Sequence, residues 1–408
     1  MFKHIEGLVN AVKLVYLRFT VVWVTAVLAL NSFVTRSRMS HENGIGTRGR
    51  VRIVDEPTFP RNEFFTPGTE FPCRMRFGAA TWKDDAKMVI RGAGLKFADD
   101  RDKAPLDLLL NSGSLAIFWS ARTFVGFMRG TIAGRGKNWT PYLGQQPMAL
   151  AGGQDGMRRD PTSIGSIVYH SQTCFGLVDL DANDYYVRYR LWPLSCEPDG
   201  TPTPDDLTHP WFQNPLPDET RNRNYLKHEA RERLAGGTIE FMLQLQARRR
   251  PPGSDPEWVT AQYLWDDTVH PWHDVAHVVL DEALDYTESM LTGFDLAHRP
   301  DCLPLPRGRS IDDPHSVLPR SCELSCMRRD YRADRPLSWV VGVPAPGVDQ
   351  SLDLSGHERR SHPLWVPCPD ELVYAATREH PVQRPWAPPV GLEPTTRCLE
   401  VIPAHAPC

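Results

Sequence analysis

A histidine followed by a glycine-rich run is the first group of residues in the chain that could do chemistry. The polar residues Ser40 to Asn43, which include His41, precede Gly44 to Gly49, which match the pattern G-x-G-x-x-G. In a dinucleotide site this pattern follows a strand and opens a helix, so that phosphate meets backbone N–H groups. Here the order is reversed, because a strand-like segment follows the glycines. The sequence therefore argues against a nicotinamide or flavin site, and the glycines are expected to let the backbone lie close against something flat.

A second candidate is a group of histidines near residue 270. His270, His273 and His277 have spacings that could bind a metal on a helix. However, Pro271 and the apolar residues that follow favour an extended segment, in which His273 and His277 would stand more than ~13 Å apart. A structural or surface role is therefore expected rather than a zinc site. The sequence contains neither a G-x-S-x-G elbow nor a P-loop.

Four blocks of sequence resemble the core of the catalase superfamily, in order and in spacing. They are residues Ser40 to Ile53, Cys73 to Phe77, Arg91 to Phe97 and Asp107 to Gly113. Weaker matches continue to Asp295, so the resemblance covers about residues 40–345. The weaker matches are Tyr169 to Gln172, Tyr185 to Tyr189, Trp265, Pro271, Val275-Ala276 and Phe294-Asp295. The resemblance implies an α+β fold, an antiparallel β-barrel with inserted helices that enclose a haem.

The resemblance also implies which residues act on the distal side, where a peroxide binds. His41 would be the base, because an imidazole can take a proton from one peroxide oxygen and return it to the other. Asn111 would hold the far oxygen through an amide hydrogen bond. Arg76 and Arg91 resemble the arginines that bind the haem propionates, a role that suits a planar guanidinium. The expected cofactor is haem b, with its iron.

The proximal side of the expected haem departs from the family pattern. The family places Arg-x-x-x-Tyr beneath the iron, and the arginine keeps the tyrosine as the ligating phenolate. Arg320 begins the corresponding segment here, but Leu324 takes the place of the tyrosine and cannot bind iron. Tyr331, the nearest tyrosine, is the predicted ligand, and Cys322 and Cys326 are nearby thiols that could in principle bind iron. The open explanations are a shifted helix, an aberrant local sequence and weakened haem binding.

The residue before the distal histidine is a second departure. Typical catalases carry an apolar residue there, whereas the hydroxyl of Ser40 could hydrogen-bond the imidazole of His41 and bias its tautomer. Catalase-related fatty-acid hydroperoxide enzymes, such as allene oxide synthase-like proteins, also have a hydroxyl residue at this position. The resemblance therefore implies a haem-dependent enzyme acting on organic, fatty-acyl hydroperoxides, with Ser40 beside the cofactor.

Short strands and few helices should position these residues. The 37 prolines and 29 glycines favour strands and irregular connections over long helices. The expected strands are Arg50 to Val54, Arg74 to Phe77, Gly94 to Phe97, Tyr185 to Trp192, Thr238 to Gln246 and Val275 to Leu280. The expected helices are Leu106 to Leu110, Ala121 to Arg129 and Asp218 to Leu234.

Composition narrows the class of partner. The 46 basic and 50 acidic residues give a formal charge of -4, so no long-range field would gather nucleic acid. The expected partner is a small-molecule hydroperoxide, and the oligomeric state is left open. Nine cysteines without paired spacing indicate reduced thiols in a protein facing the cytosol.

The two ends of the chain differ from its middle. Residues 1–39 contain an apolar run, 19–34, that is shorter than the ~20 residues of a full membrane span. The alternatives are an interfacial or anchoring helix that associates a cytoplasmic enzyme with a membrane, a helix packed on the enzyme, and a cleaved signal. Residues 40–345 form the expected haem domain. Residues 346–408 are predicted to be a Pro-rich disordered tail or a stretch outside the native coding frame.

Three functional hypotheses follow. The first is the conversion of organic hydroperoxides on haem. The second is a true catalase or peroxidase that uses hydrogen peroxide. The third is a non-enzymatic relic that binds haem weakly because Leu324 replaces the ligating tyrosine.

Overall fold

The structure is a computed structural model that describes most of the chain between residues 41 and 306. The described residues are 41–80, 84–133, 142, 146–158, 161–199, 219–253, 257–306, 312 and 315, together with 9, 11, 12, 15, 16 and 19. Three predicted site residues, Ser40, Arg320 and Tyr331, lie outside them, as do residues 20–34 and the whole of 346–408.

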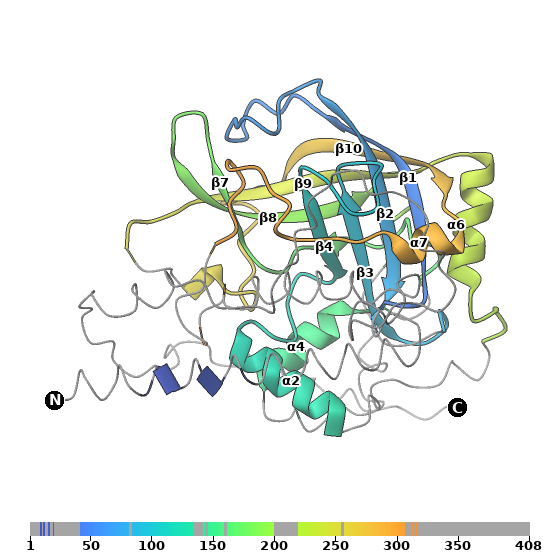
Figure 1. Cartoon of the computed structure of the whole chain (residues 1–408), viewed down its shortest axis with the longest axis horizontal. Helices are drawn as coiled ribbons and strands as arrows, with labels where there is room; N and C mark the ends of the chain where they lie inside the picture. The colour runs from blue at the N-terminus through green and yellow to red at the C-terminus, as the bar shows by residue number, and fades with distance from the viewer. Residues whose placement is uncertain are drawn as a thin grey trace, which may run out of the picture. The chain divides into compact units, whose positions relative to one another are not determined.

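Eight antiparallel strands close into a barrel. The strands pair in the order β2–β1–β10–β9–β8–β6–β4–β3, and the pairing of β3 with β2 closes the ring (Figure 1). Two short strands, β5 and β7, add to β3 and β8 outside the ring. The strands are β1 (Gly44–Ile53), β2 (Glu70–Ala79), β3 (Val89–Lys96), β4 (Asp107–Ser112), β5 (Met157–Arg158), β6 (Tyr169–His170), β7 (Phe175–Val178), β8 (Asp184–Pro193), β9 (Ile239–Arg249) and β10 (His273–Ala283). The predicted antiparallel barrel is confirmed.

Alternation of side chains along each strand fills the barrel interior. In β9, for example, Phe241, Leu243 and Leu245 are fully buried, and the residues between them are half-buried. Aromatic rings from three strands meet inside, where Phe77 lies 5.7 Å from Tyr169 and 6.0 Å from Phe241, ring centre to ring centre. Successive side chains of a strand point to opposite faces. Residues that alternate with this core therefore lie on the outer face of the barrel wall.

One predicted helix is wrong. Residues Leu106 to Leu110 were expected to be helical, but they belong largely to β4 (Asp107–Ser112), which pairs with β3 and β6. Leucine favours helices, yet this run is too short and too uniformly apolar for its period to distinguish the two structures. Pairing with β3 decides the outcome, since it buries Leu108 and Leu110 in the barrel.

The helices lie outside the barrel. They are α2 (Ala121–Ala133), α4 (Pro147–Gly156), α6 (Tyr225–Gly236) and α7 (Tyr286–Leu291), with a 3-10 turn at Glu257–Val259. The predicted helix Ala121 to Arg129 is confirmed as α2, and the one predicted from Asp218 begins later, at Tyr225. Helix α4 contacts β3 and β4, α6 contacts β9 and β10, and α7 contacts β1 (Figure 1).

A fully buried ion pair ties the end of β3 to the start of β4. The Lys96 Nζ atom lies 2.9 Å from Oδ2 of Asp107, and neither side chain is exposed to solvent. The same carboxylate oxygen accepts the backbone N–H of Asp295 at 2.8 Å and lies 2.9 Å from Nδ1 of His298. These contacts hold the segment after α7 against the barrel.

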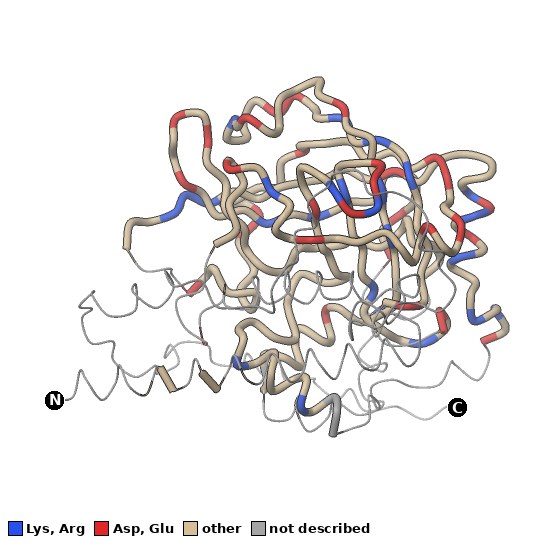
Figure 2. Tube along the Cα trace, in the orientation of Figure 1, with Lys and Arg blue, Asp and Glu red and all other residues tan. Residues whose placement is uncertain are grey.

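Charge is spread evenly over the described chain. Figure 2 shows acidic and basic residues interspersed along the trace. Within the part that the structure describes, no helix is long and apolar enough to cross a membrane. Tyr16, one of the few N-terminal residues described, accepts a hydrogen bond from Arg129 of α2.

Candidate active site

A row of three glycines crosses three neighbouring strands at one end of the barrel and ends at an asparagine on the fourth strand. Gly44 of β1 pairs with Gly78 of β2, which pairs with Gly92 of β3. Gly92 pairs in turn with Asn111 of β4. Gly78, Gly92 and Asn111 alternate with core residues, so they face outward. The three glycines leave a flat strip on the outer wall, with Asn111 at its end.

His41 lies on this strip. Its backbone has a positive φ of 55°, which turns the chain back just before β1 begins. A Cβ atom on Gly92 would be 2.5 Å from Cε1 of His41, and a Cβ atom on Gly78 would be 3.1 Å from Cβ of His41. The imidazole Nδ1 atom lies 3.2 Å from the carbonyl oxygen of Gly78. If Nδ1 carries the proton and donates to that oxygen, Nε2 is the nitrogen that can act as a base.

Asn111 lies beside His41 on the same strip. A Cβ atom on Gly92 would meet Oδ1 of Asn111 at 3.4 Å as well as the imidazole of His41. The Nδ2 atom of Asn111 donates to Oε1 of Gln172 at 3.4 Å. Gln172 is itself fixed, because its Nε2 atom donates to the carbonyl oxygens of Gly113 and Leu115 at 3.3 and 2.8 Å. The structure thus brings together the two predicted distal residues and adds Gln172, which orients the amide of Asn111.

Arg76 holds the loop that carries His41. Its guanidinium is buried and donates to the carbonyl oxygens of His41 at 2.6 Å and Glu42 at 3.1 Å. Its Nε atom donates to the carbonyl oxygen of Ser289, in α7, at 3.0 Å. Arg76, which was predicted to bind a propionate, therefore holds the backbone of His41 in place.

Arg91 belongs to a second buried network. It donates to Oδ1 of Asp85 at 3.3 Å and to the backbone oxygen of Asp85 at 2.6 Å. Asp85 also accepts from Nδ2 of Asn43 at 2.7 Å, and Asn43 accepts from Lys227. Burial raises the pKa of the Asp85 carboxyl, against the opposing effect of Arg91 and Lys227. The Nε atom of Arg91 is buried without a hydrogen-bond partner among the described residues.

The other sequence candidates have structural roles. Gly44 to Gly49 lie inside β1, which is not the strand-to-helix turn of a dinucleotide site. Gly46 allows close approach of α7, because a Cβ atom there would be 2.9 Å from Cα of Ser289. His273 and His277 lie on β10 and contact Thr58 and Glu240. Among the described residues, no group of three or more His, Cys, Asp or Glu side chains could hold a metal.

Sequence reasoning missed Gly78, Gly92 and Gln172. Gly92 and Gln172 fall inside blocks that resemble the catalase superfamily, and this was the available signal. Each of these residues contacts a site residue that is distant in the chain. Gly78, for example, is 37 positions after His41. A local pattern carries no information on such a contact.

The comparisons with known proteins agree with this fold. The chain is 30% identical over 285 residues to an allene oxide synthase-lipoxygenase protein of Plexaura homomalla, and 29% identical over 309 residues to a linolenate 9R-lipoxygenase of a Nostoc species. These matches cover 69% and 71% of this chain but only 26% and 37% of the relatives. A crystal structure of a fungal catalase matches with a TM-score of 0.55 and 17% identity, over 74% of this chain and 60% of that one. No family model matches the chain.

The closed barrel therefore has a catalase-like fold. Within that class, the resemblance to allene oxide synthase-like proteins, predicted from the ordered blocks, is confirmed.

Proposed function

We propose that the chain is a haem-dependent enzyme that converts organic hydroperoxides, with fatty-acyl hydroperoxides as the substrate class. The observation that carries the proposal is the placement of His41 and Asn111 side by side over Gly92. A base and an amide donor on one flat strip are what a peroxide needs for the transfer of a proton between its two oxygens. The names of the relatives, which include an allene oxide synthase and a linolenate lipoxygenase, support a lipid substrate.

The residues of the strip fit a flat cofactor such as haem b. Gly78 and Gly92 present backbone alone, so a planar group can approach the imidazole of His41 without a clash from either. Arg76, two residues before Gly78 and so on the same face of β2, and Arg91 stay the predicted propionate-binding arginines. When bound, haem would supply the iron that takes up the peroxide and cleaves its O–O bond. Tyr331 stays the predicted iron ligand, and Arg320, which begins the segment that resembles the family's proximal pattern, stays a predicted cofactor-binding residue.

The residues of this chain then have distinct parts. His41, held through Nδ1 by Gly78, uses Nε2 to take a proton from the peroxide and to return it. Asn111 has two amide hydrogens, one given to Gln172 and a second that can donate to the far oxygen of the peroxide. Arg76 fixes the backbone of His41 and keeps the imidazole over the strip. Ser40 biases the tautomer of His41.

A true catalase or peroxidase is the second candidate, favoured by the catalase-like fold. The two reactions share the proton transfer by His41, so they are separated by substrate. The cytoplasmic location and the membrane association through residues 19–34 stay predictions.

The test is a comparison of substrates on protein purified from haem-supplemented cells. We expect a Soret band and rapid loss of a fatty-acid hydroperoxide, with slow oxygen release from hydrogen peroxide. Fast oxygen release with the fatty-acid hydroperoxide left intact would support a true catalase. Absence of a Soret band would support the non-enzymatic relic and overturn the proposal.

A further inference from the structure

A small pocket lies between helices α6 and α7, next to the first residue of β1. Its volume is about 160 Å³, several times the ~30 Å³ that a water molecule occupies in the liquid. It is therefore large enough for one carboxylate or phosphate group, but too small for a haem. Its lining residues are Gly44 of β1, Asn224 beside α6, Lys227, His228 and Arg231 of α6, and Tyr286 and Ser289 of α7.

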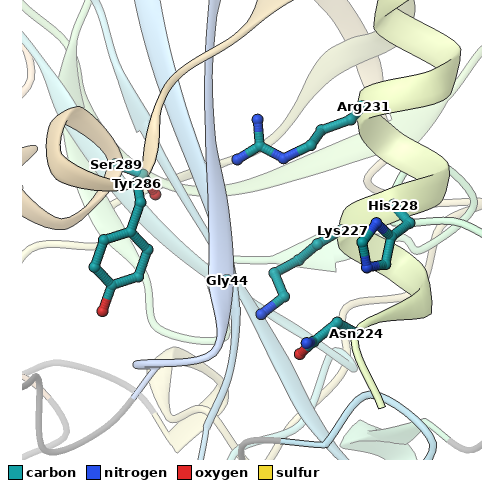
Figure 3. Close-up of a pocket in the computed structure, with 7 residues that line it drawn as sticks. All are labelled: Gly44, Asn224, Lys227, His228, Arg231, Tyr286 and Ser289. Atoms are coloured by element: carbon teal, nitrogen blue, oxygen red, sulfur yellow. The ribbon is translucent and has the colours of Figure 1, made fainter. Parts of the chain in front are cut away.

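The pocket is positively charged. Lys227 and Arg231 stand one turn apart on α6, and Figure 3 shows both extending from the helix toward β1. None of the seven lining residues is acidic. Burial lowers the pKa of Lys227, and the positive charges of Arg223 and Arg231 lower it further, against the effect of Asp85. A negatively charged ligand would relieve the repulsion among these cations.

A buried hydroxyl lines the same pocket without a partner. The side chain of Ser289 is 3% exposed, and its Oγ atom makes no hydrogen bond within the described part of the chain. Buried polar groups in folded proteins almost always have a partner, so an unpaired donor in a pocket wall indicates a missing acceptor. The unpaired Ser289 hydroxyl is independent of the positive charge on α6, and it also indicates a ligand that accepts hydrogen bonds.

The pocket adjoins the loop of the distal histidine. The backbone oxygen of Ser289 accepts from Arg76, which also donates to the backbone oxygen of His41. On the other side, Lys227 donates to Asn43, two residues beyond His41. A ligand bound between α6 and α7 would therefore contact Ser289 and Lys227, the two residues that connect these helices to that loop.

We propose that this pocket is a binding site for a small anion that carries a single carboxylate or phosphate group. Lys227 and Arg231 supply the charge, and the Ser289 hydroxyl donates the hydrogen bond that no described residue accepts. The site does not require bound haem, so it stands apart from the proposed function. The carboxylate of a fatty acid and free phosphate share this chemistry.

The experiment is a titration of the full chain with octanoate and, separately, with inorganic phosphate, followed by calorimetry at constant ionic strength. Ser289→Ala and Arg231→Met are the test variants. Ser289→Ala removes only an unpaired hydroxyl, so it should fold normally. Arg233→Met is the matched control, because Arg233 lies on the same helix, pairs with Glu229 and does not line the pocket.

We expect saturable binding of at least one anion, weakened roughly tenfold in each test variant and unchanged in the control. Binding of octanoate alone would identify a fatty-acid carboxylate as the ligand, and binding of phosphate alone would identify phosphate. Absence of saturable binding by either anion would overturn the proposal. Binding to Ser289→Ala and Arg231→Met that is as strong as binding to the wild type would overturn it as well.

Discussion

The imidazole of His41 lies so close to the α-carbon of Gly92 that a Cβ atom there would be 2.5 Å from Cε1. Asn111 pairs with Gly92 on the next strand, so both predicted distal residues are positioned by one glycine. The site therefore depends on the lack of a side chain at Gly92 as much as on the side chains of His41 and Asn111.

Gly92→Ala should therefore displace the imidazole without unfolding the barrel. Misplacement of a catalytic group by about 1 Å commonly costs on the order of 100-fold in rate, and we expect a loss of hydroperoxide turnover of that size. Steady-state kinetics and thermal unfolding measure the two effects separately. Gly236→Ala is the control, because a Cβ atom there meets nothing within 4 Å. Full turnover in Gly92→Ala would show that the position of His41 on the strip is not required.

Gln172→Leu should lower kcat by about tenfold and leave KM nearly unchanged, since Gln172 orients the amide of Asn111 and acts only through it. Gln172→Glu keeps the acceptor for Asn111 but loses the donor to Leu115. It should fall between the leucine variant and the wild type. A rise in KM alone would assign Gln172 to substrate binding instead.

Lys96→Met should destabilise the barrel, because it leaves the fully buried carboxylate of Asp107 without its cation. Breaking one side of such a pair typically costs about 3–5 kcal/mol. Urea unfolding of the haem-free protein measures the change. The double variant Lys96→Met, Asp107→Leu should recover much of the loss, since no charge is then left in the interior. A single variant as stable as the wild type would contradict this account.

His170 should make stability depend on pH. Burial first, and then the charge of Arg190, lower the pKa of His170 from 6.5 to about 4. Between these values the unfolded chain binds a proton that the folded chain does not, so unfolding becomes easier as the pH falls from 6.5 toward 4. Unfolding in urea across this range should show a shallower slope for His170→Gln than for the wild type. A slope that is as steep in His170→Gln as in the wild type would contradict this account.

The long strands could be predicted from sequence, and the short elements could not. β1, β2, β8, β9 and β10 each span ten or eleven residues, and the predictions found at least part of each of them. β6 has only two residues, yet it joins β4 to β8 and so completes the ring. A segment of that length has no measurable period, so only its pairing partners define it.

The candidate site was also predictable only in part. His41 and Asn111 came from a resemblance between ordered blocks, because neither residue is distinctive alone. The strip beneath them was not foreseen, since it joins glycines from strands that are distant in sequence. The contacts of Arg76 with the His41 loop likewise arise from pairing of β1 with β2.

The central claim is that His41 is the proton-transferring base of a haem enzyme, and one measurement tests it most directly. Haem-loaded wild type and His41→Ala would be mixed with a fatty-acid hydroperoxide, and the loss of the hydroperoxide would be followed in a stopped-flow instrument. We expect the same Soret absorbance in both proteins and a rate at least ~100-fold lower in the variant. An equal rate in two proteins with intact Soret bands would contradict the claim.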